Sequence, residues 1–188
     1  MKKIYAILGV VVLASLAVAS VYFLFFASPV SKNGATDVNI ASTTDQAVVS
    51  VRAVPPGMRE YTDQRYKFSL LYPEALEVNT VDEGGGASTI TFQNPSAGQG
   101  FQIFIVPFFE EQITDERFKR DVPSGVRTNV EEVMVDGAKG SAFYSRDLVL
   151  GETREVWFLK GGYLYEVTTL KALEADLLEV LKTWQFLP

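Results

Sequence analysis

Residues 156–169, VWFLKGGYLYEVTT, decide the fold class of this 188-residue chain. Two short apolar runs flank Gly161-Gly162, and a two-residue glycine loop between such runs is typical of a β-hairpin. If the two strands pair across this two-residue loop, Phe158 faces Tyr165 and Val156 faces Val167. One face of the hairpin is then aromatic and β-branched. The opposite face carries Trp157, Leu159 and Leu164. The stretch therefore predicts two neighbouring antiparallel strands.

The segment before this hairpin predicts more strands of the same sheet. Residues 100–108, GFQIFIVPF, are apolar at odd and even positions alike, which is typical of a central strand covered on both faces. Short alternating runs predict further strands at 66–72, 76–81 and 89–93. Asp136-Gly137 predicts a second tight hairpin between Val133 and Tyr144.

Two helices are expected within or beside this sheet. Thr114 is an N-cap candidate followed by acids, so a short helix should run from there toward Val122. From Lys171 onward apolar residues recur at helical spacing, at Leu173, Leu177, Val180, Leu181 and Trp184. The fold class is therefore α+β, an antiparallel β-sheet flanked by helices, together with the N-terminal helix described next.

Residues 4–27, IYAILGVVVLASLAVASVYFLFFA, contain no charge and predict a transmembrane helix. As a helix they would span about 36 Å, against about 30 Å of hydrocarbon. Lys2 and Lys3 precede the segment, so the positive-inside bias keeps residues 1–3 in the cytoplasm. We therefore expect a single-pass protein of the cell membrane, in contact with the lipid bilayer through 4–27, with its C-terminal domain extracytoplasmic.

A cleaved signal peptide is the alternative reading of the same segment. Ala17-Val18-Ala19 fits a small-x-small cleavage site, and the protein would then be secreted. Residues 28–60 are rich in Ser, Thr, Asn, Asp, Ala and Pro and read as a flexible linker. Residues 61–188 form the predicted extracytoplasmic domain.

Composition excludes several chemistries. The chain has no cysteine and no histidine, which removes disulfides, thiolate catalysis and every Ser-His or Cys-His nucleophile arrangement. Its net charge of −6 argues against binding nucleic acid, which needs a basic surface. We expect no cofactor, no metal and no catalytic residue.

Acidic pairs supply the available polar chemistry. Glu110, Glu111 and Asp115 are close enough in sequence to meet around a hard cation such as Ca²⁺. No EF-hand spacing is present, however, so a solvated loop is expected there. Phe108 and Phe109, followed by Glu110 and Glu111, are the candidate surface for a protein partner, although core burial is the more usual fate of such aromatic residues.

The order of elements resembles the Mog1/PsbP-like superfamily over roughly residues 61–187. The resemblance lies in Phe68-Ser69-Leu70-Leu71-Tyr72-Pro73, Val135-Asp136-Gly137, Tyr163-Leu164-Tyr165 and the closing Trp184-Gln185-Phe186. It implies an antiparallel sheet of six or more strands with helices on both faces. Members of that superfamily are accessory or binding proteins, and no shared catalytic motif exists to carry over. Glu74-Ala75-Leu76 stands where a tryptophan often follows the Tyr-Pro pair, and the metal-binding histidines of the photosystem branch are absent.

These observations favour a membrane-anchored extracytoplasmic binding or accessory domain without catalysis, acting on a protein partner in the membrane or envelope. One alternative is an extracytoplasmic hydrolase that uses paired carboxylates. Another is a structural subunit of a cell-envelope complex, which would expose an apolar patch.

Overall fold

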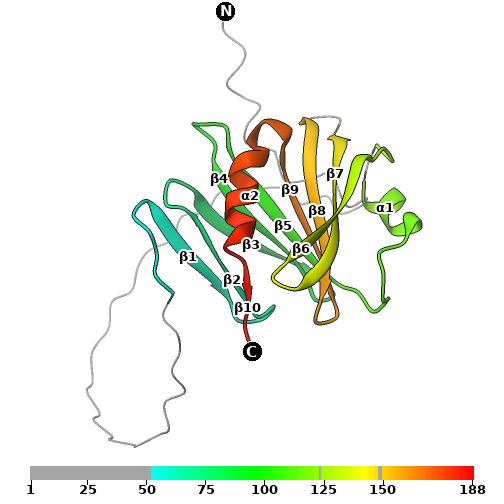
Figure 1. The fold of residues 1–188 in the computed structure, drawn as a ribbon, viewed down its shortest axis with the longest axis horizontal. Coiled ribbons are helices and arrows are strands. Elements are labelled where there is room, and N and C mark those ends of the chain that lie inside the picture. The colour runs from blue at the N-terminus through cyan, green and yellow to red at the C-terminus, as the bar shows by residue number, and fades with distance from the viewer. Residues whose placement is uncertain (1–51, 123, 148–149) are drawn as a thin grey trace, which may run out of the picture. The chain divides into compact units, whose positions relative to one another are not determined.

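The computed structural model describes residues 52–122, 124–147 and 150–188 (Figure 1). Its elements follow one another in the order β1 (Met58–Asp63), β2 (Phe68–Pro73), β3 (Glu77–Gly84), β4 (Ala87–Asn94), β5 (Gln99–Pro107), α1 (Asp115–Asp121), β6 (Thr128–Val135), β7 (Ala138–Asp147), β8 (Gly151–Lys160), β9 (Tyr163–Leu170), the 3-10 turn η1 (Lys171–Leu173), α2 (Glu174–Lys182) and β10 (Gln185–Phe186).

A seven-stranded antiparallel sheet forms the centre of the domain, in the order β3-β4-β5-β9-β8-β7-β6. β5 pairs with β4 on one side and with β9 on the other. Phe101, Ile103 and Ile105 on one face of β5 and Phe104 on the other are buried, as expected of a strand covered on both faces. The predicted central strand is confirmed.

The hairpin of β8 and β9 has the register predicted from its glycine turn. Phe158 pairs with Tyr165 across β8 and β9, and Gly161 and Gly162 both have positive φ, at 60° and 81°. A type I′ turn needs positive φ at both central residues, and glycine adopts it without steric cost. The hairpin of β6 and β7 turns in the same way at Asp136-Gly137.

A second sheet differs from the expectation of one sheet. β1, β2 and β10 form a separate three-stranded sheet in which both neighbours run antiparallel to β2. Figure 1 shows β10 continuing from the end of α2 and lying beside β2. The sequence gives no signal for β10, because a strand of two residues is too short to show alternation.

Helix α2 covers one face of the seven-stranded sheet over a core of aromatic and aliphatic side chains. Phe158 lies flat against Tyr165, with ring centroids 5.1 Å apart. Trp184, just after α2, stacks on Phe68 of β2 at 4.4 Å and meets the edge of Phe158 at 5.2 Å. These aromatic contacts join α2, the larger sheet and the smaller sheet into one core.

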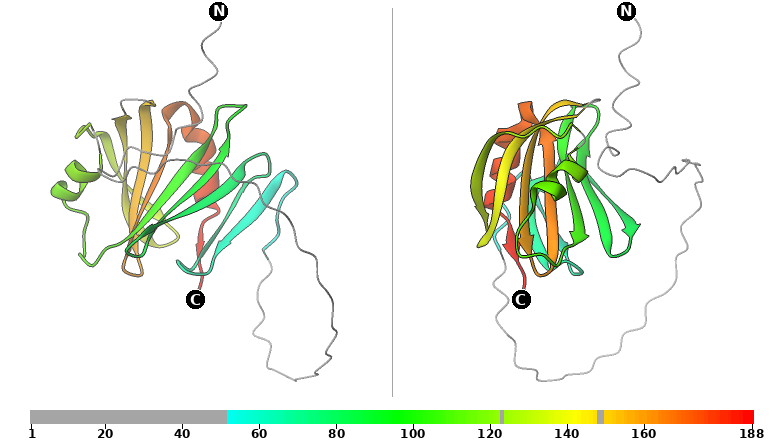
Figure 2. Two further views of the ribbon diagram at one scale, coloured as in Figure 1. Left: turned by 180° about the vertical axis from the view of Figure 1, so that it is seen from behind. Right: turned by 90° about the vertical axis from the view of Figure 1, so that its right-hand side faces the viewer.

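Helix α1 covers the opposite face, over β7 and β8 (Figure 2). Its Phe118 stacks on Trp157 with centroids 4.8 Å apart and meets the edge of Phe143 at 5.4 Å. The helix begins where predicted, because the Thr114 side chain accepts a hydrogen bond from the backbone N–H of Arg117. Helices therefore lie on both faces of the sheet, as expected.

The folded domain begins earlier than the predicted boundary at residue 60. Met58 and Glu60 belong to β1 and pair with β2, although the composition of 28–60 predicts a linker there. The predicted membrane-spanning segment 4–27 and most of the linker lie outside the described residues. Within the described residues, no helix is long and apolar enough to cross a bilayer.

Candidate binding site

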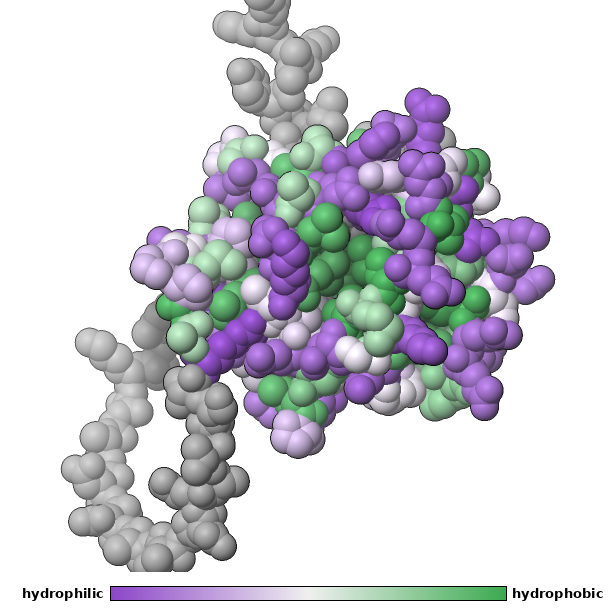
Figure 3. Space-filling view, in the orientation of Figure 1, coloured by the Kyte–Doolittle hydropathy of each residue, from purple (hydrophilic) through white to green (hydrophobic). Residues whose placement is uncertain are grey.

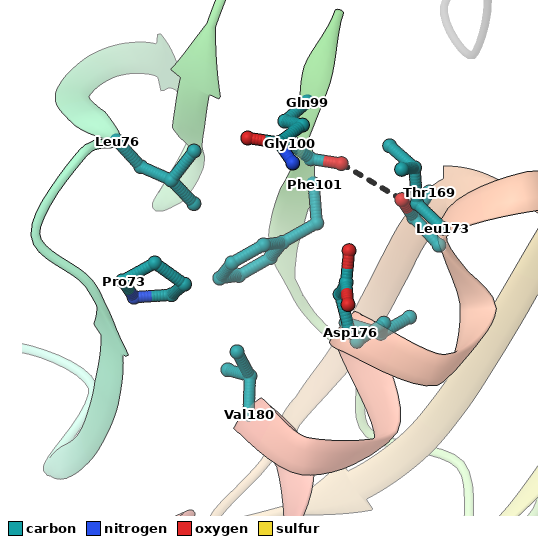
Figure 4. A pocket seen from close by; sticks show the side chains of 10 residues that line it. Pro73, Leu76, Gln99, Gly100, Phe101, Thr169, Leu173, Asp176 and Val180 are labelled. Carbon is teal, nitrogen blue, oxygen red and sulfur yellow. Dashed lines mark hydrogen bonds between the residues drawn. The ribbon is translucent and has the colours of Figure 1, made fainter. Parts of the chain in front are cut away.

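A recess of about 180 Å³ lies where the first turns of α2 meet the start of β5 and the end of β2 (Figure 4). Three segments that are far apart in the sequence contribute to its lining, namely Pro73 and Leu76, then Gln99, Gly100 and Phe101, and finally Thr169, Leu173, Asp176, Leu177 and Val180. Most of this lining is aliphatic or aromatic.

Local structure explains how the apolar walls come together. Pro73 ends β2, and the backbone N–H of Leu76 donates to its carbonyl at 3.0 Å, which closes a tight turn. Leu177 and Val180 are three residues apart on α2 and therefore share one helix face. Phe101, on β5, lies between the turn and the helix.

The polar side chains of the recess differ in whether they already have a hydrogen-bond or ion-pair partner. Thr169 Oγ1 donates to the Gly100 carbonyl at 2.7 Å, so this pair is satisfied internally (Figure 4). Asp176 is exposed, and its carboxylate takes part in none of the ion pairs or hydrogen bonds found among the described residues. The recess is therefore an apolar cavity with one available negative charge.

A cluster of largely buried charged side chains lies beneath α1, on the face of the sheet opposite the recess. The Arg117 guanidinium donates to Glu166 Oε1 at 3.2 Å and also forms an ion pair with Asp121. Both carboxylates are buried. Burial and the neighbouring charge of Asp121 raise the pKa of Glu166 well above its ordinary value, although Arg117 opposes that rise.

Glu155 is a further buried carboxylate on the same face. It accepts hydrogen bonds from Thr168 Oγ1 at 2.6 Å, from Thr153 Oγ1 at 2.8 Å and from Trp157 Nε1 at 3.4 Å. Burial raises the pKa of Glu155, and these three donors oppose the rise. The carboxylate is thus tied into the sheet by its own neighbours.

These buried carboxylates do not line the recess, and Asp176 is the single carboxylate among its lining residues. Glycoside hydrolysis by paired carboxylates needs two such groups on either side of a substrate, roughly 5 to 10 Å apart. The recess does not have that arrangement.

The residues predicted as a partner surface divide into two groups. Phe109 is 92% exposed, and Glu110 and Glu111 are exposed beside it. Phe108 is instead only 7% exposed and packs with Phe118 in the cluster beneath α1, which corrects its assignment to the surface. The partner-surface hypothesis now concerns 109–111 and stays a prediction.

The acids considered for a cation do not gather around one point. Asp115 pairs with Arg127 at 2.7 Å, while Glu110 and Glu111 lie in the preceding loop. Across the described ranges, no group of three or more acidic side chains is arranged to hold a metal ion.

Seven large apolar side chains are exposed among the described residues, three of them on or just before β6. They are Val54, Val81, Phe109, Val126, Val130, Met134 and Leu178. Figure 3 shows hydrophobic residues at the surface next to α2, among hydrophilic residues that cover much of this side of the domain. Single exposed apolar residues are ordinary on soluble domains.

Sequence reasoning missed the recess as a site. It identified Leu173, Leu177 and Val180 as one helix face, but a face buried on a sheet and a face lining a cavity give the same pattern. The meeting of this face with Leu76 depends on contacts across about 100 residues of chain, which periodicity does not report.

Comparison with known proteins gives a match in structure. No protein-family model matches the sequence, and the comparison with curated proteins found no match. The solution structure of cyanobacterial PsbP (CyanoP) from Synechocystis sp. PCC 6803 superposes with a TM-score of 0.51 at 15% identity, covering 72% of this chain and 98% of that one. A crystal structure from Bacteroides thetaiotaomicron VPI-5482 has a TM-score of 0.48 at 17% identity, covering 70% of this chain and 49% of that one.

The domain therefore has a PsbP-like fold, as the sequence resemblance predicted. At 15% identity the similarity concerns the fold, and the functional argument has to come from the site itself.

Proposed function

We propose that this chain is a membrane-anchored binding or accessory domain that acts on a protein partner outside the cytoplasm, without catalysis. One observation carries the proposal. The recess is an apolar cavity whose single lining carboxylate, Asp176, has no ion pair among the described residues, while Glu155 and Glu166 are held in internal hydrogen bonds and ion pairs. Such a cavity suits the recognition of an apolar group and lacks a pair of groups for acid and base catalysis.

The location in this proposal rests on the sequence of residues 4–27 and on the two lysines before them. Membrane extraction tests it. The full chain should stay with the membrane after alkaline carbonate washing and should keep residues 1–19. A mature protein free in solution, with its first residue at Ser20 or later, would show that the segment is a cleaved signal peptide.

Affinity capture tests the function itself. The full chain, solubilised with its membrane, should retain a stoichiometric protein partner. The matched bait keeps residues 1–51 and replaces 52–188 with an unrelated soluble domain, and it should lose that partner. Glycan turnover without a partner, abolished by Glu166→Gln or Glu155→Gln, would favour the hydrolase instead.

A further inference from the structure

The size of the recess indicates what it can hold. Pockets for whole small-molecule ligands usually enclose about 300 to 1,000 Å³, whereas an apolar cavity of about 150 Å³ holds one benzene molecule. At about 180 Å³ the recess matches a single large apolar side chain. Interfaces between proteins commonly place one such anchor residue in a pocket of the partner.

Charge around the recess indicates what should flank that anchor. Asp176 is one of the lining residues and takes part in none of the ion pairs found in the described part of the chain. Glu74 and Glu77 are exposed on either side of the lining residue Leu76. A carboxylate in the lining of an apolar recess complements an apolar residue with a basic neighbour.

We propose that the recess at the corner of α2 and β5 is the anchor site for a basic segment of the protein partner. One phenylalanine-sized or leucine-sized side chain enters between Phe101, Leu177 and Val180, and an adjacent lysine or arginine pairs with Asp176. This inference rests on the proposed function, because it specifies how that partner is recognised.

Short peptides test the chemistry directly. The probe is the acetylated, amidated peptide Lys-Phe-Lys, added to the full chain in nanodiscs of zwitterionic lipid, with methyl NMR signals of leucine and valine as the readout. Lys-Ala-Lys is the control for the anchor, and Glu-Phe-Glu is the control for the charge.

Lys-Phe-Lys should shift the methyl signals of Leu76, Leu177 and Val180 in a saturable way. Lys-Ala-Lys should bind at least about tenfold more weakly, because it lacks the ring that would be removed from water. Glu-Phe-Glu should bind several-fold more weakly, because it places negative charges beside Asp176. Equal binding of all three peptides, or no shift at these methyl groups with Lys-Phe-Lys, would overturn the inference.

Substitutions then connect the recess to the partner. Asp176→Asn should weaken Lys-Phe-Lys binding about two- to fivefold, as expected for one exposed ion pair, and Glu116→Gln on α1 should leave it unchanged. Leu173→Trp should fill the recess and abolish capture of the partner. Leu178→Trp is its matched control, because Leu178 is an exposed residue on α2 that does not line the recess.

The two hypotheses fail in different ways. If the unsubstituted chain captures no partner, the proposed function fails, whatever the peptides do. If it captures a partner that Leu173→Trp and Asp176→Asn capture equally well, the function stands and the anchor site is overturned. Thermal unfolding of each variant shows whether it is folded, and Asp176→Asn changes an exposed residue, so it tests the inference even if Leu173→Trp does not fold.

Discussion

The two faces of the seven-stranded sheet are stabilised in different ways. On the α2 face the core consists of aromatic and aliphatic side chains, with Phe158, Tyr165 and Trp184 at its centre. On the α1 face the aromatic cluster shares the sheet with the buried carboxylates Glu155 and Glu166. Aromatic and aliphatic packing dominates the α2 face, where the buried Arg154 is compensated by Glu131 and Glu174. The α1 face instead holds three buried carboxylates, Asp121, Glu155 and Glu166, whose charges must remain compensated. The four predictions below test this contrast.

The largest effect is expected on the α2 face. Phe158→Ala removes a fully buried ring that stacks on Tyr165, and it should lower the free energy of unfolding by about 3 to 5 kcal/mol. Denaturant titration followed by tryptophan fluorescence measures this loss. Leu178→Ala, at an exposed position of α2, is the control and should change stability by less than about 0.5 kcal/mol. A loss below 1 kcal/mol for Phe158→Ala would contradict the packing argument.

The α1 face should respond to removal of its central cation. Arg117→Met leaves Asp121 and Glu166 buried without their shared partner, and it should cost about 3 kcal/mol. Hydrogen exchange should show the loss first in the amides of α1, because that helix can detach from the sheet. Adding Glu166→Gln to Arg117→Met should restore part of the protection, and no recovery would argue against charge as the cause.

A smaller effect on the free energy of unfolding should appear when the pH is changed, because the buried glutamates of the α1 face titrate. The pKa values of Glu155 and Glu166 are raised in the folded domain, so the folded state binds protons that the unfolded chain has already released. Their contribution to stability is complete below the ordinary glutamate value of 4.5 and is lost as the pH rises through the folded pKa. Glu166→Gln should therefore become more stable relative to the unsubstituted chain as the pH rises from 4.5 to 8. A constant difference over this range would contradict the raised pKa.

The smallest effect concerns the start of α1. Thr114→Ala removes the side-chain oxygen that accepts from the Arg117 backbone N–H at 3.2 Å, and it should cost about 1 kcal/mol. The loss should be local, seen as faster hydrogen exchange in α1 with little change in α2. Thr62→Ala, at an exposed position on β1, is the matched control. Equal effects of the two changes would show that the cap contributes nothing specific.

Sequence predicted those parts of the fold that are determined locally. The hairpin at Gly161-Gly162 could be placed in register because its turn and its alternating side chains lie within 14 residues. The smaller sheet could not, since Gln185 pairs with Ser69 across most of the domain. The recess escaped prediction for the same reason.

One available signal was overlooked. Glu155 and Glu166 share the strand parity of Trp157 and Leu164, which were placed on a common face from the sequence. Alternation therefore puts both carboxylates on that face, and only their burial required the structure. The ion pair between Arg117 and Glu166 could not have been predicted, because it joins residues 49 positions apart.

The pairing of β10 with β2 sets a condition on the order of events during synthesis. Ser69 meets Gln185 only after 116 further residues have been added, as the difference of their numbers shows. At the usual elongation rates of 5 to 20 residues per second, β2 waits roughly 6 to 23 s for this neighbour. A growing chain therefore keeps one side of β2 unpaired until Gln185 and Phe186 emerge, and a chaperone that shields this strand has that interval in which to act.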